Sequence, residues 1–269
     1  MNYTKNRADI VILNGKIITV DPMNSISEAV AIKDTIILKV GTRKEIEKLI
    51  DKDTHIIDVK GRAVLPGFID SHIHFQLLAI NLKYREPIHV PPLNSLKDVF
   101  KLLKKRAKET PQGEWIVGWG SFHLNHKYRE KRYPTKLELD EVLPDHPAAL
   151  FSGPHICIVN SKALLQAGIT KETPEHVKLP GRMALIEKDS ATGEPIGIIR
   201  EAGELLPLPK FTYEQIEDAL RDIMMRDFVQ QGVTSIHDMP GLEVFRIYQK
   251  WTKNNELPLR IRVYFYMPK

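Results

Sequence analysis

Two histidines two residues apart, His72 and His74, are the strongest candidates for chemistry in this 269-residue sequence. They follow a Pro66-Gly67 turn signal, in a run of β-prone residues. Because successive side chains of a strand point to opposite faces, Asp70, His72 and His74 are expected on one face. The other face would anchor the strand in a core through three apolar residues: Ile69, Ile73 and Phe75. Two imidazoles at this spacing can bind one metal ion, although a half-buried strand with two incidental histidines would have the same pattern.

A second histidine pair, His123 and His126, could suggest another metal site. Its surroundings argue against a cation, because four basic residues follow closely: Lys127, Arg129, Lys131 and Arg132. His237 and Asp238 end a predicted strand, and alternation lets only one of them point inward, so a structural or supporting role is favoured for both. His55 has no partner nearby in sequence and is interpreted as a structural or surface histidine.

The composition is that of an ordinary globular protein, with 42% hydrophobic and 27% charged residues. The single cysteine, Cys157, excludes an internal disulfide and suits a reducing compartment. No signal peptide or run of ~20 apolar residues is found, so a cytoplasmic location and no membrane association are expected. The net charge is +5, but the lysines of 101–108 fall on the polar face of an amphipathic helix, which disfavours nucleic-acid binding.

The elements that must position these residues fall into three stretches. Residues 9–65 have short strands with tight turns, interrupted by a helix from Thr42 to about Ile50 whose Thr42 and Glu45 have capping-box spacing. Residues 86–200 have a less regular pattern. Residues 201–269 alternate strands and helices, which predicts a parallel sheet with helices outside. In the helix that ends at Gly232, Met224 and Met225 are expected in the core.

Several sequence elements resemble one protein family. Pro-Gly-Phe-Ile-Asp-Ser-His-Ile-His at 66–74 is similar to the first barrel strand of the amidohydrolase superfamily of metal-dependent hydrolases. The following elements, in this order, resemble its type 3 or YtcJ-like branch: Gly118-Trp119-Gly120, Pro144-Asp145-His146-Pro147, His155, Asn160-Ser161-Lys162-Ala163-Leu164 and Ala167-Gly168-Ile169. Several independent elements in the right order are more specific than any one motif.

The resemblance implies an α/β fold, a partial TIM-type (β/α)₈ barrel. Residues 1–62 would be the N-terminal part of a small β-sandwich domain, and residues 63–269 an incomplete barrel with a large α+β insertion at about 86–200. His72, His74 and Glu201 would bind one or two divalent ions, most simply zinc, with Glu201 in the place of a bridging carboxylated lysine. A surface Glu at a helix start is the alternative for Glu201. His155 and Trp119 would lie on the substrate side.

The barrel is expected to be incomplete. Residues 63–85 and 201–269 suffice for about three of eight units, because a unit takes roughly 31 residues. The general-base aspartate and two further histidines of the family are expected beyond Lys269, since residues 239–269 contain neither residue type. Catalytic residues within the chain are therefore not assigned.

Two functions are carried forward. The first is a metal-dependent hydrolase of carbon–nitrogen bonds in a non-peptide amide or formamide-like small molecule (EC 3.5 type). The second is an inactive or truncated fragment that needs a partner to complete its fold. Because an unpaired strand edge favours association, the expected protein partner is a second copy or a complementing C-terminal chain.

Overall fold

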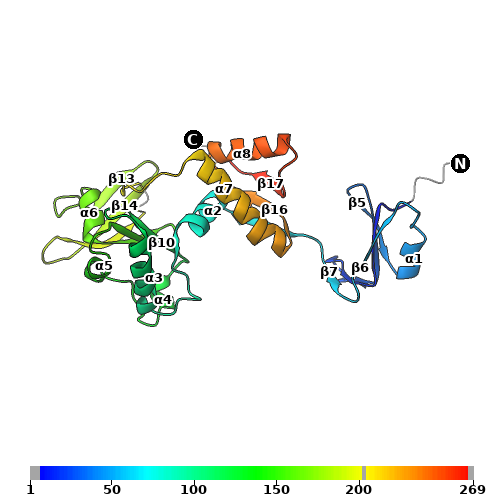
Figure 1. Ribbon diagram of the computed structural model, residues 1–269, viewed down its shortest axis with the longest axis horizontal. Coiled ribbons are helices and arrows are strands. Elements are labelled where there is room, and N and C mark those ends of the chain that lie inside the picture. Colours follow the sequence, from blue (N-terminus) through cyan, green and yellow to red (C-terminus); the bar gives the residue numbers. More distant parts are fainter. Residues whose placement is uncertain (1–6, 202–203, 266–269) are drawn as a thin grey trace. The chain divides into compact units, whose positions relative to one another are not determined.

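A computed structural model of the chain describes residues 7–201 and 204–265. The chain forms two compact units (Figure 1): Met1–Ile69 with Gly232–Ser235, and Asp70–Gln231 with Ile236–Lys269. Both contain strands and helices, so the fold is of mixed α/β type, as expected. In the part of the chain that the structure describes, no helix is long and apolar enough to cross a membrane.

The first unit consists mainly of short strands, as its sequence predicts. One sheet has the order β5 (Ile36–Gly41), β4 (Ala29–Lys33), β1 (Ile10–Leu13) and β6 (His55–Asp58). A second sheet has the order β3 (Ile26–Ser27), β2 (Lys16–Ile18) and β7 (Ala63–Val64). Alternation along β1 buries Val11 and Leu13, which share a core cluster with Ile46 of α1 (Arg43–Glu47). The predicted division at residue 62 stays a prediction.

The capping box of α1 forms as its spacing predicts. The Glu45 amide donates to Thr42 Oγ1 at 3.4 Å, and the Thr42 amide donates to Glu45 Oε2 at 3.0 Å. The helix ends at Glu47, earlier than the expected end near Ile50. His55 is exposed, in agreement with its interpretation as a surface histidine.

Residues 86–200 fold around one mixed sheet of seven strands and are more regular than their sequence pattern suggests. The strand order is β13 (His176–Leu179), β14 (Arg182–Lys188), β15 (Pro195–Arg200), β12 (Ile156–Val159), β11 (Ala148–Ser152), β10 (Ile116–Gly120) and β9 (Glu86–Pro87). Helices accompany it: α3 (Leu96–Glu109), α4 (Leu124–Lys127), α5 (Lys136–Val142) and α6 (Ser161–Gln166). Its regularity is hidden in the sequence because β12 pairs with β15, some forty residues further along the chain.

Apolar side chains cover both faces of this sheet. On one face, Ile116 and Leu150 join a core cluster with Leu103 of α3 and Leu139 of α5. On the other, Phe151, Cys157 and Ile199 join a cluster with Leu164 of α6, against which Trp119 packs. Burial on both faces means that residues 86–200 have a substantial core of their own.

The remaining elements alternate between strands and helices. They are β8 (Phe68–Ile73), α2 (Phe75–Tyr84), α7 (Tyr213–Ile223), β16 (Val233–Asp238), α8 (Leu242–Lys253) and β17 (Arg260–Val263), and the sheet order is β17-β16-β8. The helical segment of α7 continues through a π-helical turn, Met224–Phe228, and a 3₁₀ turn, Val229–Gln231. It ends at Gly232, where φ is +84°.

Met224 and Met225 differ from the prediction that both lie in the core. Met224 is fully buried, but Met225 is 41% exposed. The reason is helical geometry: consecutive residues are offset by about 100° around the axis, so a single apolar stripe rarely takes both.

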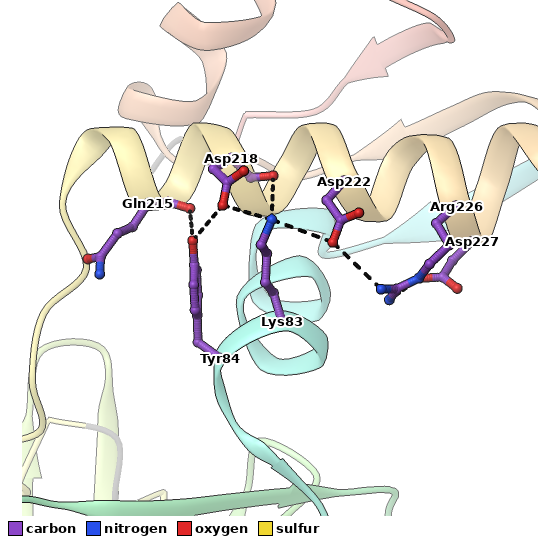
Figure 2. A network of polar contacts seen from close by, with 7 residues as sticks. All are labelled: Lys83, Tyr84, Gln215, Asp218, Asp222, Arg226 and Asp227. Atoms are coloured by element: carbon purple, nitrogen blue, oxygen red, sulfur yellow. Dashed lines mark hydrogen bonds and ion pairs between the residues drawn. The ribbon is translucent and has the colours of Figure 1, made fainter. Parts of the chain in front are cut away.

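Polar contacts join the last turn of α2 to α7 (Figure 2). Lys83 Nζ lies 2.7 Å from Asp218 Oδ2 and 3.5 Å from Asp222 Oδ2. Tyr84 donates its hydroxyl to Asp218 Oδ2 at 3.0 Å, and Phe211 stacks on its ring. The two carboxylates are exposed and Lys83 is partly buried, so solvent screening leaves these ion pairs a modest contribution to stability.

Candidate functional site

His72 and His74 lie at the end of β8 and the start of α2. Their ring centroids are 5.4 Å apart and the rings are nearly perpendicular, at 86°. Both side chains are exposed. His72 is a strand residue, whereas His74 is the N-cap position of α2 and has left the extended conformation, with φ −109° and ψ 76°. The bend at His74 turns its imidazole beside that of His72, so the two rings form a pair.

The opposite face of β8 follows the prediction only in part. Ile73 and Phe75 are buried, but Ile69 is 62% exposed. The predicted burial of this face is therefore confirmed for Ile73 and Phe75. It is wrong for Ile69, which no described residue covers. Gly67, just before the strand, lies so close to Thr234 of β16 that a Cβ at this position would collide with the Thr234 side chain. Asp70 turns back along its own chain and accepts the His72 amide at 3.1 Å.

The pair fits half of a metal site. Two imidazoles side by side are ligands that Zn²⁺ accepts, but a protein site for this ion usually takes three or four protein ligands. Among residues 7–201 and 204–265, no three His, Cys, Asp or Glu side chains are grouped closely enough to hold a metal ion. Glu201 is thus not gathered with His72 and His74, and its assignment as a ligand stays a prediction.

Glu201 is instead joined to His155. His155 Nδ1 and Glu201 Oε1 are 2.7 Å apart, and the Glu201 amide donates to the His155 carbonyl at 2.8 Å. The antiparallel pairing of β12 with β15 opposes Ile156 to Arg200 and so brings the next residues together. Glu201 has φ +54°, a left-handed conformation that is costly for a residue with a Cβ. His155, predicted on the substrate side, and Glu201, predicted as a metal ligand, therefore contact each other directly.

The aromatic ring of Phe122 lies beside this pair. Phe122 lies 5.9 Å from the His155 ring, and its own side chain is 50% exposed. His123 lies 6.4 Å from Phe122, and His126 lies 6.1 Å from His123. These distances place the three rings in a loose cluster. Phe122 was not predicted, because a lone Phe after a strand carries no spacing signal.

Trp119 lies on the other face of β10 from Ile116. Its ring is 5.5 Å from that of Phe151 and 5.7 Å from the Arg85 guanidinium carbon. It is partly buried. The structure does not test the substrate role predicted for Trp119 and His155.

Asp238 has the hydrogen bonds of a structural carboxylate, as its position suggested. It is fully buried and accepts the amides of Phe75 at 2.8 Å and Met239 at 2.9 Å. It also accepts the Tyr248 hydroxyl at 2.8 Å. Burial, and then the Asp238 charge, raise the pKa of Tyr248, so this hydroxyl keeps its proton. His237 is less enclosed, and its Nδ1 lies 3.5 Å from the Tyr264 hydroxyl.

The Asn-Ser-x-Ala-Leu element has a local structural purpose. Asn160 is fully buried and caps α6, because its Oδ1 accepts the Ala163 amide at 3.0 Å. The same oxygen accepts the Ala148 amide of β11, and Nδ2 donates to the His146 carbonyl at 2.8 Å. One side chain therefore fixes a helix start, a strand and the turn before it.

Residues 55–267 match the profile of the Amidohydrolase family. The chain is 32% identical to the N-substituted formamide deformylase of Arthrobacter pascens over 262 residues, which are 94% of this chain and 47% of that protein. It is 30% identical to the putative amidohydrolase YtcJ of Bacillus subtilis (strain 168), over 78% of this chain and 39% of that protein.

Two solved structures share the fold at low sequence identity. An uncharacterized metal-dependent hydrolase from Pyrococcus horikoshii superposes with a TM-score of 0.60 at 20% identity, over 95% of this chain and 48% of that one. Its counterpart from Pyrococcus furiosus gives 0.57 at 21% identity, over 95% and 50%. The chain thus spans about half the length of these relatives or less. By its profile match, it belongs to the Amidohydrolase family, in the type 3, YtcJ-like branch.

Proposed function

We propose that this chain supplies the first metal ligands and the inserted sheet of a metal-dependent amidohydrolase. The reaction is hydrolysis of a carbon–nitrogen bond in a non-peptide amide or formamide-like small molecule. The observation that carries the proposal is the paired imidazoles of His72 and His74 at the end of β8, 5.4 Å apart. The 32% identity with a formamide deformylase supports the substrate class.

The bound ion, most simply zinc, would polarise the scissile carbonyl and lower the pKa of a bound water to about 7. Within this chain, His72 and His74 would bind it through ring nitrogens. Glu201 would be the carboxylate ligand, and its bond to His155 leaves Oε2 free of that partner. His155 would then orient the carboxylate and face the substrate together with Trp119. The position of Glu201 apart from the histidine pair requires the two to approach when the site is assembled.

The fold proposed for the assembled enzyme is a TIM-type barrel, of which β8, β16 and β17 are three strands. The other ligands and the general-base aspartate would come from protein outside these 269 residues. That protein would be either the same polypeptide or another chain. Exposed Phe68 and Ile69 on β8 support this proposal, because further strands would cover them.

The first experiment measures metal per chain by mass spectrometry after purification without added metal. A bound ion at about one per chain is expected, and His72→Ala should lower it severalfold. His55→Ala is the matched control, because His55 is exposed on β6 and should leave metal content unchanged. Equal metal in the His72→Ala and unchanged proteins would overturn the ligand assignment.

The second candidate function is a chain that stays inactive until a partner completes it; the chain spans 47% of the length of the formamide deformylase that it matches. Hydrolysis of an N-substituted formamide separates the two. A monomeric, active 269-residue chain would exclude the need for a partner, whereas activity only on adding the missing half of a relative would establish it.

A further inference from the structure

Arg85 occupies an unusual position just after α2. It is the C-cap residue of that helix, and its amide donates to the Asn81 carbonyl at 3.3 Å. Its guanidinium carbon lies 5.7 Å from the Trp119 ring centroid and 5.3 Å from that of Phe151. The side chain thus leaves the helix and lies over two aromatic rings of the seven-stranded sheet. Burial lowers the pKa of Arg85, which reflects the loss of water around its charge.

Among the described residues, the charge of Arg85 has no anionic partner. No carboxylate within the described parts of the chain pairs with it, and the adjacent Glu86 is turned to Arg106, with Oε1 3.3 Å from Nε. Aromatic rings attract a guanidinium through their faces, but they accept none of the N–H bonds that point outward in its plane. A partly buried guanidinium with unused donors is therefore a site that an oxyanion would satisfy.

A cavity of about 140 Å³ adjoins this side chain, and Arg85 forms part of its wall. Most of the other wall residues are apolar or aromatic: Trp115, Val117, Leu208, Pro209 and Phe211. The remaining charges, Glu86 and Arg106, are paired with each other and leave Arg85 as the unbalanced one. The volume is that of roughly five waters, which suits a ligand with a carboxylate and a short hydrocarbon tail.

We propose that Arg85 and this cavity bind a small monocarboxylate, with the carboxylate on the guanidinium and the hydrocarbon against the apolar wall. A planar carboxylate can accept two parallel N–H bonds from the guanidinium, and it brings a single negative charge to the partly buried Arg85. Inorganic phosphate, which carries more charge and no apolar part, fits the wall less well. Arg85 follows the ten residues of α2, about 15 Å along the chain from His74. The inference does not depend on metal binding or hydrolysis.

The test is a fluorescence titration of the 269-residue chain with sodium butyrate at constant ionic strength, using sodium chloride as the balance. Trp115 lines the cavity and the Trp119 ring lies beside the Arg85 guanidinium, so a saturable change in tryptophan emission is expected. Arg85→Gln should weaken binding by about tenfold or more, as the loss of a charge-assisted hydrogen bond predicts. Arg129→Gln, which removes an exposed cation elsewhere in the same sheet region, should bind as the unchanged protein does.

Arg85→Lys guards against a folding defect in the first variant. It keeps the charge but loses the fork, and circular dichroism should report an unchanged fold with severalfold weaker butyrate binding. The proposal is overturned if butyrate gives no saturable change, or if Arg85→Gln binds it equally well. It is also overturned if inorganic phosphate binds as tightly as butyrate, which would indicate a general anion site.

Discussion

The seven-stranded sheet and the strand β8 differ in how completely their side chains are covered. All five residues of β11 are buried, because apolar clusters lie on both faces of its sheet. On β8, four of six residues are exposed, including Phe68 and Ile69. Residues 86–200 thus have the packing of an independent core, whereas the strand with the candidate metal ligands is largely exposed to solvent. In this chain, the best-packed part and the part with the proposed chemistry are different.

The strongest test of this difference compares two substitutions that each shorten an aliphatic side chain to alanine. Leu103→Ala removes a fully buried side chain from the core beneath the seven-stranded sheet and should lower the free energy of unfolding by about 3 kcal/mol. Ile69→Ala on β8 should lower it by less than about 0.5 kcal/mol, since most of that side chain is already in water. Urea denaturation measures both. Equal effects would mean that β8 is covered in solution and would remove the contrast.

A smaller effect is expected from the buried cap of α6. Asn160→Ala should lower the free energy of unfolding of residues 86–200 by about 2 kcal/mol, because it removes the cap and leaves the Ala148 amide without its acceptor. Hydrogen exchange of the α6 and β11 amides locates the loss. Ser161→Ala is the neighbouring control, since it removes an exposed hydroxyl that donates to Asp140 Oδ2 at 2.7 Å, and it should change stability by a few tenths of a kcal/mol.

The smallest effect concerns pH and the start of α5. Hydrogen bonds from Arg132 and then from Thr135 lower the pKa of Glu138 from 4.5 to about 2, against burial, which raises it. Because the folded-state pKa is depressed, the pair stabilises the fold above about pH 4.5 and loses this contribution as the pH falls toward 2. Both groups are partly exposed, so screening reduces the contribution to about 1 kcal/mol.

The measurement is the stability difference between the unchanged protein and Arg132→Gln, followed from about pH 6 to about pH 2. The difference should shrink as Glu138 becomes protonated. In a Glu138→Gln background, Arg132→Gln should have almost no effect at any pH. A difference that grows in acid would contradict the assigned direction of the pKa shift.

Local features were the most predictable from sequence. The capping box at Thr42 forms as expected, because it depends on residues only three positions apart. The mixed α/β fold and the histidine pair were also predictable, from strand alternation and family resemblance. The seven-stranded sheet was not, since the pairings of β9 with β10, β10 with β11 and β12 with β15 join strands far apart in the chain.

The arrangement of the candidate site was predictable only as a set of separate residues. The bond between His155 and Glu201 depends on the register of β12 with β15, which no local pattern encodes. Arg85 left no signal either: a single arginine between Tyr84 and Glu86 looks like an ordinary surface charge, and only the position of the rings of Trp119 and Phe151 makes it distinctive.

The reactivity of Cys157 can report how often the seven-stranded sheet opens. This residue is the only cysteine of the chain, it is fully buried in β12, and burial raises the pKa of its thiol. An alkylating reagent reacts with the thiolate, so labelling requires the strand to be exposed first. The rate of alkylation under native conditions therefore measures how often this sheet opens, without any added probe.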